Sequence, residues 1–462
     1  MNTFFQHLLC GIVLRRKVYD TLLEWKNRKH KCLFIKGQHR VGKTSIIEKF
    51  GHENYEHFVS FNFSEEADIH SIFGGNLDAD SVIRGMILYR NPDDFHPGST
   101  LILLDEIQEC PEARTALKFL TIDGRYDVIA SGSLLGIDMP RKKFKENGAI
   151  RPLVPTGYEE HIEMHSLDFE EFLWANNISE DIIERVKTSI CEKRAIDKAV
   201  YERFESLFRD YMVVGGMPES VEAYISSKNY AAPDKVLKDI VDCISLDINR
   251  YNSGVDCDRT SECFRSIPSQ LADTNKKFMY SRISGGKSRK SSDIYSKNLL
   301  WIKGAGIGNF CYSLNTVESP LVLKENHDIF KVYLSDTGIL THMCGNVTVR
   351  AVVNGDTSVN QGSIVENAVC ECLVKSGYVT RYYRKNNGEM MMELDFVVEI
   401  GSELAVIEVK SGKQRTAPSL NKVPRFFRVD RRMVLEQSNI FVSDDGVEHY
   451  PLFASAFLAE RT

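Results

Sequence analysis

The sequence predicts an α/β fold that begins with a parallel sheet covered by helices on both faces. Residues 32–37 (CLFIKG) have the pattern of a short buried strand, and the loop after them leads into the start of a helix, TSIIEKF. A strand, a loop and a helix in that order make half of a parallel α/β unit. Residues 101–107 (LILLDEI) are almost continuously apolar, which is typical of a strand buried on both faces.

Further elements extend this pattern along the chain. Residues 57–63 (HFVSFNF) and 126–133 (YDVIASGS) predict two more strands, and residues 15–28 have the apolar spacing of a helix. Residues 158–184 hold nine acids and no Lys or Arg, and their apolar positions predict a small helical region. From Gly362 onward the pattern predicts a helix followed by three strands: VENAVCECLVKSG, then VTRYYRK, ELDFVVEI and ELAVIEVKSG.

Length and charge limit the classes of protein that fit. At 462 residues the chain is too long for one hydrophobic core, so we expect two to four domains. An apolar fraction of 43% and a charged fraction of 26% are ordinary for a soluble globular protein. The net charge of −6 gives no overall attraction to nucleic acid or to an anionic membrane. A nucleic-acid partner would therefore need a local basic patch.

Cysteine usage and hydropathy predict a soluble cytoplasmic protein. The 11 cysteines are odd in number and include no CxxC pair, so we expect neither a disulfide framework nor a zinc site. The opening MNTFFQHLLCGIVLRRK carries its positive charge after the apolar stretch, unlike a signal peptide. No apolar run reaches the roughly 18 residues that a membrane span requires, so no membrane partner is expected.

Residues 37–44, GQHRVGKT, match the phosphate-binding pattern GxxxxGK[ST]. Such a loop surrounds the β-phosphate with backbone N–H groups, and glycine is needed where a side chain would collide with the phosphate. Lys43 supplies a cation to the β- and γ-phosphates, and Thr44 offers a hydroxyl to magnesium. We therefore predict ATP and Mg²⁺ as ligands, with nucleotide-binding residues Gly37, Val41, Gly42, Lys43, Thr44, Ser45 and Ser131.

The strand LILLDEI ends in two acids at the edge of the sheet where ligands bind in α/β folds. Asp105 is predicted to hold the Mg²⁺ through water, and Glu106 to orient and polarise the attacking water. Glu106 and Lys43 are thus the predicted catalytic residues. Ser131 and Ser133 end a neighbouring strand, where a hydroxyl could detect the γ-phosphate. Spacing does not identify an arginine finger, for which Arg151 is the candidate.

Nine segments taken in order resemble a known family: GQHRVGKT, LILLDEIQ, IASGSLLG, HSLDFEEFL, GGMPES, KVYLSDTGIL, GSIVENAV, ELDFVVE and IEVKSG. They are similar to segments of the prokaryotic AAA-type ATP-binding proteins that carry a C-terminal domain of unknown function related to PD-(D/E)XK nucleases. The resemblance covers most of the chain. That family often has arginine where this chain has His39.

The resemblance implies four parts. They are a P-loop AAA-like ATPase core over residues 1–157, a helical lid over 158–235, a winged-helix-like segment over 236–345, and an α/β restriction-endonuclease-like domain over 346–462. In the last part, Glu366 lies on a predicted helix, Asp395 on a strand, and Glu408 and Lys410 share one face of the next strand. Two carboxylates and a lysine in this pattern could bind magnesium and activate water for phosphodiester cleavage. An inactive fold used only for binding is the alternative.

Two basic segments are candidates for contact with DNA. Residues 274–292 hold six Lys or Arg and no acid, and residues 410–432 hold eight Lys or Arg and one acid. The first is either a DNA-contacting wing or a solvated charged loop.

Three functions remain open: an ATPase that controls a DNA-directed module, an ATP-gated nuclease, and a nucleotide-dependent switch acting through protein partners. Whether the chain forms a homo-oligomer is also open.

Overall fold

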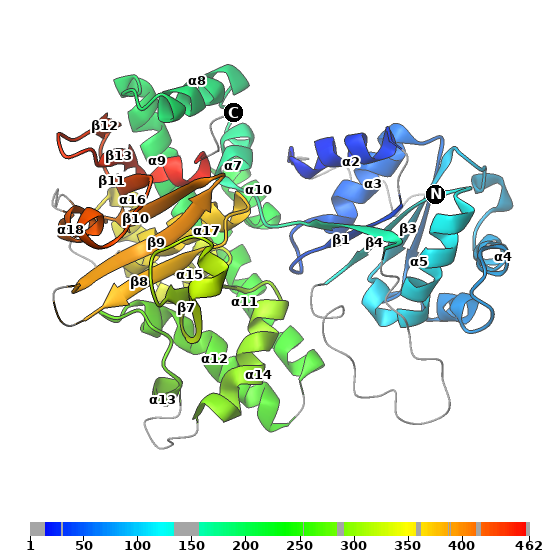
Figure 1. Ribbon diagram of the computed structural model, residues 1–462. Helices are drawn as coiled ribbons and strands as arrows, with labels where there is room; N and C mark the ends of the chain where they lie inside the picture. Colours follow the sequence, from blue (N-terminus) through cyan, green and yellow to red (C-terminus); the bar gives the residue numbers. More distant parts are fainter. Residues whose placement is uncertain are drawn as a thin grey trace. The chain divides into compact units, whose positions relative to one another are not determined.

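The first sheet is parallel throughout and has the strand order β2-β3-β4-β1-β5 (Figure 1). The computed structural model describes residues 14–28, 31–133, 157–252, 254–283, 291–356, 362–386, 388, 390–412 and 417–458. Arg15–Ser166 with Gly304–Gly306 form one compact unit, called the N-terminal unit below, and the rest forms the C-terminal unit. The strands of this sheet are β1 Cys32–Lys36, β2 His57–Asn62, β3 Thr100–Asp105, β4 Asp127–Gly132 and β5 Glu159–Glu163.

The strands of this sheet alternate their side chains between two apolar layers. Phe34, Phe61 and Ile102 belong to a core that also contains Val82 and Leu117 from the helices on that face. Figure 1 shows α3 and α5 on opposite faces of the sheet. The predicted strands and the predicted first helix are therefore confirmed, with helices α2 Val18–Lys26, α3 Lys43–Asn54, α4 Ala79–Tyr89 and α5 Pro111–Asp123.

The prediction of a helical region from residue 158 is wrong at its start. Glu159–Glu163 form strand β5, which pairs with β1 in the register Phe34–His161. Only the first of its five residues is buried, so this edge strand (EEHIE) lacks the apolar signal that marks the others. The N-terminal unit consequently extends to Ser166, beyond the predicted end of the core at residue 157.

Helices dominate the first half of the C-terminal unit. The turn GGMPES precedes a helix as predicted, since α10 begins at Pro218. The described helices are α7 Phe169–Ala175, α8 Glu180–Cys191, α9 Lys198–Val214, α10 Pro218–Ser227, α11 Ala231–Tyr251, α12 Val255–Leu271, α13 Tyr280–Ile283, α14 Ser291–Gly304, α15 Thr337–Cys344, α16 Asn346–Asn354, α17 Gly362–Lys375 and α18 Pro418–Phe426.

The second sheet is mixed and has the order β12-β13-β11-β10-β9-β8-β6-β7. The helix and three strands predicted for the tail are confirmed as α17, β8, β9 and β10. Its strands are β6 Gly308–Leu314, β7 Glu325–Leu334, β8 Arg381–Lys385, β9 Met392–Ile400, β10 Glu403–Val409, β11 Arg431–Glu436, β12 Phe441–Val442 and β13 Glu448–Pro451.

The hairpin β6–β7 joins this sheet although it precedes the predicted boundary at residue 346. β6 pairs in parallel with β8 at Tyr312–Arg381 and antiparallel with β7. Strand pairing therefore continues across residue 346. The sequence pattern did not indicate this, because backbone pairing between distant strands leaves no periodic signal in either strand.

Candidate functional site

The loop between β1 and α3 has the backbone conformation that the glycine pattern predicts. Gly42 has φ 89° and directly precedes α3, in the left-handed region that favours glycine. A Cβ atom added to Gly37 would lie 2.2 Å from the backbone oxygen of Met164. Gly37 is therefore also required by the segment after β5, which packs against the loop within the same unit.

Lys43 is buried beneath the loop, with 6% of its surface exposed. Its Nζ donates hydrogen bonds of 3.0 Å to the carbonyl oxygens of Gly37 and Gln38. Burial lowers the pKa of Lys43, and the negative charges of Glu106 and Asp105 oppose that shift. The side chain is thus a desolvated cation at the loop, which suits it to interact with phosphate oxygens.

The predicted magnesium ligands lie together at the carboxyl ends of the strands. The Thr44 hydroxyl donates a 2.9 Å hydrogen bond to Oδ2 of Asp105, and the Ser131 hydroxyl donates to Oδ1 of the same carboxylate. Asp105 is 2% exposed. A hydroxyl and a carboxylate are oxygen donors of the kind that Mg²⁺ takes, so these residues fit the predicted ion. Ser131 orients Asp105 in this arrangement.

Glu106 lies one residue beyond Asp105 with the left-handed backbone angles φ 53° and ψ 43°. Its backbone N–H donates 3.1 Å to Oδ1 of Asp105. The side chain is partly exposed and accepts a hydrogen bond from the amide of Gln108. The structure thus brings Lys43, Thr44, Asp105, Glu106 and Ser131 to one edge of the sheet.

Two other predicted nucleotide-binding residues have different surroundings. Ser45 is exposed at the start of α3, whereas Val41 is buried completely. The hydroxyl of Ser133 is buried and has no hydrogen-bond partner among the described residues. Arg151, the candidate arginine finger, lies outside the described residues.

Arg16 holds the loop from outside the motif. It is 7% exposed; Nη1 donates 2.8 Å to the carbonyl of Val41 and Nη2 donates 2.7 Å to the carbonyl of His165. Sequence reasoning missed this residue, because nothing in the run RRK before α2 relates it to a loop 25 residues later. Gln108 was missed for a similar reason, although LILLDEIQ places it two residues after Glu106.

The C-terminal unit contains a second set of predicted site residues. Glu366 on α17 is 1% exposed and accepts hydrogen bonds from Lys331 at 2.9 Å and from Lys276 and Tyr333. Burial would raise the pKa of Glu366, but Lys331 and Lys276 outweigh burial and hold it at about 2. Glu366 is therefore an ionised carboxylate at neutral pH, and its oxygens already have three donors.

Asp395 and Glu408 lie on the paired strands β9 and β10. Asp395 Oδ2 accepts a 2.8 Å hydrogen bond from the backbone N–H of Val409. Burial, and then the charge of Glu366, raise the pKa of Asp395 to about 6. Lys410 donates to Oε1 of Glu408, as expected for two residues on one strand face, and the buried Oε2 has no hydrogen-bond partner among the described residues.

The donor set around β9 and β10 fits a small ion only in part. Within the described ranges, no group of three or more His, Cys, Asp or Glu side chains is arranged to hold a metal. Magnesium often takes one or two carboxylates, and substrate phosphates complete its coordination. Asp395 and the unpaired oxygen of Glu408 fit that pattern, whereas Glu366 does not, because lysines occupy its oxygens.

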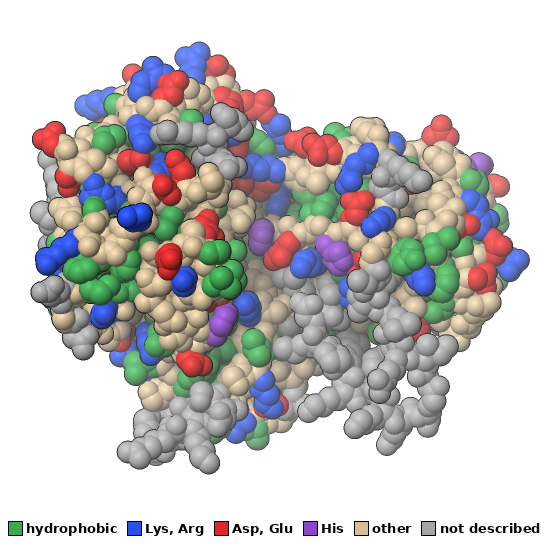
Figure 2. Space-filling model, viewed as in Figure 1, with side chains coloured by type: hydrophobic (Ala, Val, Ile, Leu, Met, Phe, Trp, Pro, Cys, Tyr) green, Lys and Arg blue, Asp and Glu red, His purple; other side chains and the backbone are tan. Residues whose placement is uncertain are grey.

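The basic segments are more neutralised than their sequences indicate. Lys276 pairs with Glu366 and Arg282 with Asp273, while Lys287, Arg289 and Lys290 lie outside the described residues. In the second segment Arg431 is buried against Glu448, but Lys422, Arg425 and Arg428 in and after α18 are exposed. On the face of the molecule drawn in Figure 2, Lys and Arg side chains are interspersed with acidic ones.

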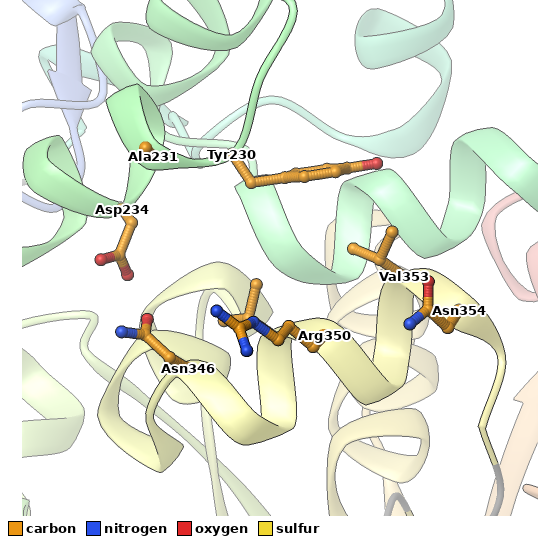
Figure 3. Close-up of a pocket in the computed structure, with 8 residues that line it drawn as sticks. Tyr230, Ala231, Asp234, Asn346, Arg350, Val353 and Asn354 are labelled. Carbon is orange, nitrogen blue, oxygen red and sulfur yellow. The ribbon is translucent and has the colours of Figure 1, made fainter.

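A surface pocket of about 400 Å³ lies between the start of α11 and α16 (Figure 3). Arg350 points into it from α16, and Asp234 faces it from α11 while contacting His342 at 2.6 Å. The Tyr230 hydroxyl donates 2.6 Å to Asp210, which fixes the ring as one wall. The remaining lining residues are Ala231, Asn346, Val349, Val353 and Asn354. The residues that line the pocket include none of the predicted site residues.

Family comparisons cover three segments of the chain. Residues 29–173 match the AAA domain family, residues 205–349 match a domain of unknown function (DUF8612), and residues 361–453 match another (DUF4143). No curated protein matches the chain. In the described part of the chain, no helix has the length and apolarity needed to cross a membrane. The match of residues 29–173 to the AAA domain family supports an AAA-type ATP-binding domain in this part of the chain.

Several solved structures are similar to the chain. One is a Walker-type ATPase of Pyrococcus abyssi, with 11% identity over 72% of this chain and 96% of that chain and a TM-score of 0.43. Another is DnaA from Aquifex aeolicus bound to AMPPCP, with 18% identity, 62% and 86% coverage and a TM-score of 0.25. A third is the RuvB Holliday junction branch migration motor of Thermotoga maritima, with 13% identity, 64% and 89% coverage and a TM-score of 0.27.

Proposed function

We propose that the AAA-type domain is a magnesium-dependent ATPase. The observation that carries this proposal is the contact of Thr44 with Asp105 at 2.9 Å, with Lys43 under the loop and Glu106 beside it. Thr44 and Asp105 would hold Mg²⁺, which neutralises phosphate charge when bound. Lys43 binds the β- and γ-phosphates, and Glu106 orients water and accepts its proton.

Two variants separate binding from hydrolysis. Lys43→Ala removes a buried cation from the phosphates, so ATP affinity is expected to fall by an order of magnitude or more. Glu106→Gln keeps the size of the side chain but removes the carboxylate that orients water, so affinity is retained and turnover falls. Titration with a fluorescent ATP analogue, together with a phosphate-release assay, measures both quantities. Equal loss of binding in the two variants would show that these roles are assigned wrongly.

We further propose that the nucleotide cycle controls a DNA-directed module in the C-terminal unit. Helices α12, α13 and α14 precede the hairpin β6–β7, and this order is also that of a winged helix, although here the hairpin belongs to the second sheet. Exposed Lys422, Arg425 and Arg428 supply positive charge in and after α18. Both features favour a phosphate-contacting surface, and salt-dependent DNA binding tests it.

A metal-dependent nuclease is the second candidate function. It is favoured by the buried, unpaired Oε2 of Glu408 next to Asp395, since an unsatisfied buried carboxylate oxygen is costly unless a cation or donor completes it. Asp395 and Glu408 would hold the ion, and Lys410 would contact the phosphate. If neither cleavage nor metal binding is found, the C-terminal fold serves as a binding module, and the chain is a nucleotide-dependent switch with DNA or protein partners.

A further inference from the structure

We infer that Gln108 is a positioning residue that sets the orientation of the Glu106 carboxylate for ATP hydrolysis. This inference rests on the proposed ATPase function and goes beyond it, because neither the nucleotide-binding loop nor the two acids of β3 identify this side chain. Gln108 lies in the single turn Ile107–Glu109 directly after Glu106 and is 6% exposed.

The amide of Gln108 has both of its ends engaged. Its Nε2 donates to Oε2 of Glu106, and its Oε1 accepts a 3.3 Å hydrogen bond from the backbone N–H of Ser133. Because a backbone N–H only donates and an ionised carboxylate only accepts, this arrangement fixes which end of the amide faces which partner. The side chain thus ties the Glu106 carboxylate to the end of β4.

The local packing is built around this amide. A Cβ atom added to Gly132 would lie 2.6 Å from Oε1 of Gln108, so the glycine at the end of β4 leaves the space that the amide fills. Glu106 itself has left-handed backbone angles, which a residue other than glycine adopts only when its surroundings hold it there. The turn sets the backbone of Glu106. Among the described residues, Gln108 is the side chain that donates a hydrogen bond to its carboxylate.

Residues next to Ser133 and Gln108 also contact Asp105, the proposed magnesium ligand. Ser131, two residues before Ser133 on β4, donates to Asp105, and the backbone N–H of Glu106 donates to Asp105 as well. Through Gln108, Glu106 is connected to Ser133, directly after β4, and Asp105 is connected to Ser131 on β4. Both acids are thus held at the end of this strand.

Two variants of nearly equal size test this role. Gln108→Glu still accepts from Ser133 but replaces the donor facing Glu106 with a second carboxylate. Gln108→Met removes both hydrogen bonds. We expect kcat for ATP hydrolysis to fall about ten- to a hundredfold in both, the effect of losing a hydrogen bond to a charged group, while KM changes less than threefold.

The split between kcat and KM separates positioning from a structural effect. In both variants kcat should fall while KM and the affinity for an ATP analogue stay close to those of wild type. A residue that merely supports the fold would lower the melting temperature and the ATP affinity together with kcat. Glu112→Gln, a nearby change on α5, is the control and should leave kcat and KM unchanged.

Failure of this inference can be distinguished from failure of the proposed function. Wild-type turnover together with unchanged kcat in both Gln108 variants would overturn the positioning role alone. A wild type that hydrolyses ATP no faster than Glu106→Gln would overturn both. Full retention of fluorescent ATP-analogue binding in the variants shows that a loss of kcat does not come from unfolding.

Discussion

The hydroxyl of Tyr211 donates a 2.7 Å hydrogen bond to Oε1 of Glu371, 160 residues further along the chain. Oε2 of Glu371 accepts from the backbone N–H of Thr337 at 2.7 Å and from its hydroxyl at 2.5 Å. Lys375 contacts the same carboxylate at 2.6 Å and also donates to the carbonyl of Leu167 at 2.9 Å. This buried network joins α9, α15 and α17 in the C-terminal unit.

Neutralising Glu371 should destabilise the C-terminal unit strongly. Glu371→Gln leaves Lys375 buried without its counter-charge, and such losses cost about 3–5 kcal/mol. Tyr211→Phe removes one hydrogen bond to this carboxylate, which keeps Lys375 and Thr337 as donors, and should cost about 2 kcal/mol. Urea unfolding followed by circular dichroism measures both. Glu202→Gln is the matched control, since Glu202 has a side chain 62% exposed and should change stability by less than about 0.5 kcal/mol. Equal midpoints for Glu371→Gln and Glu202→Gln would contradict the role of the network.

Asp395 should make the unfolding free energy depend on pH. Its folded pKa of about 6 lies above the value of 3.8 for an exposed aspartate, so the folded state binds its proton more tightly than the unfolded state does. The stability from this group is therefore complete below pH 4 and is lost as pH rises through about 6. Between pH 4 and pH 7 the wild type should lose about 2 kcal/mol of unfolding free energy that Asp395→Asn does not lose.

Glu366 should act in the opposite direction and at lower pH. Its folded pKa of about 2 lies below 4.5, so it stabilises the fold above pH 4.5 and loses that contribution as pH falls towards 2. Unfolding measured at pH 3, 4.5 and 7 separates the two groups. Asp444→Asn, at an exposed aspartate, is the control. If Asp395→Asn has the same pH dependence as wild type between pH 4 and 7, the surroundings assigned to Asp395 are wrong.

Neutralising the basic residues in and after α18 should weaken DNA binding. The triple variant Lys422→Gln, Arg425→Gln, Arg428→Gln removes three phosphate-contacting charges, so affinity falls for all sequences alike. The slope of log K against log salt should become shallower by up to about 2.7, because fewer counterions are released. The control neutralises three exposed charges elsewhere in the same unit: Arg185, Arg194 and Lys198. Identical slopes in both triple variants would reject a DNA surface at α18.

The segment before α14 is tested in the same way. Neutralising Lys287, Arg289 and Lys290 should weaken duplex binding and flatten its salt dependence if this segment is a DNA-contacting wing. Fluorescence anisotropy with a labelled duplex at several salt concentrations measures both effects. Unchanged affinity and slope would leave only the solvated-loop interpretation of these residues.

The nuclease alternative makes a separate prediction about metal. Calorimetry should detect Mn²⁺ binding to the full-length protein without nucleotide, and Asp395→Ala should weaken it sharply, since few protein ligands hold the ion. Asp395→Ala and Lys410→Ala should both abolish metal-dependent DNA cleavage. ATP hydrolysis should stay intact in both variants, because Lys43 and Glu106 belong to the other unit. Absence of Mn²⁺ binding and of cleavage in wild type would reject a catalytic site.

The positions of four predicted site residues could be derived because they follow from local sequence. A glycine loop between a strand and a helix, and an acid pair at a strand end, each define a backbone position, so Lys43, Thr44, Asp105 and Glu106 came together as expected. Arg16 and Gln108 could not be found in this way. Their roles depend on which backbone groups the fold brings to them, the carbonyl of Val41 and the N–H of Ser133.

The C-terminal unit shows the same limit. The sequence indicated Glu366, Asp395, Glu408 and Lys410, and the last two do share a strand face. It did not indicate that Lys331 on β7 pairs with Glu366 and has a side chain that is 0% exposed. The segments GGMPES and KVYLSDTGIL were noted only for their resemblance to a family, and the sequence alone indicated no physical role for either segment. In the structure the N–H of Gly216 donates 2.8 Å to Asp336, so the two segments pack against each other.

Single-turnover hydrolysis of ATP by the full-length protein tests whether Mg²⁺ and Glu106 are needed for ATP hydrolysis. Protein in excess over radiolabelled ATP is mixed with Mg²⁺ or with EDTA, and phosphate release is followed for wild type and Glu106→Gln. We expect release by wild type with Mg²⁺, none with EDTA, and a rate at least a hundredfold lower for Glu106→Gln despite retained binding. Equal rates for wild type and Glu106→Gln, or hydrolysis that is unaffected by EDTA, would show that the domain is not a magnesium-dependent ATPase that uses Glu106.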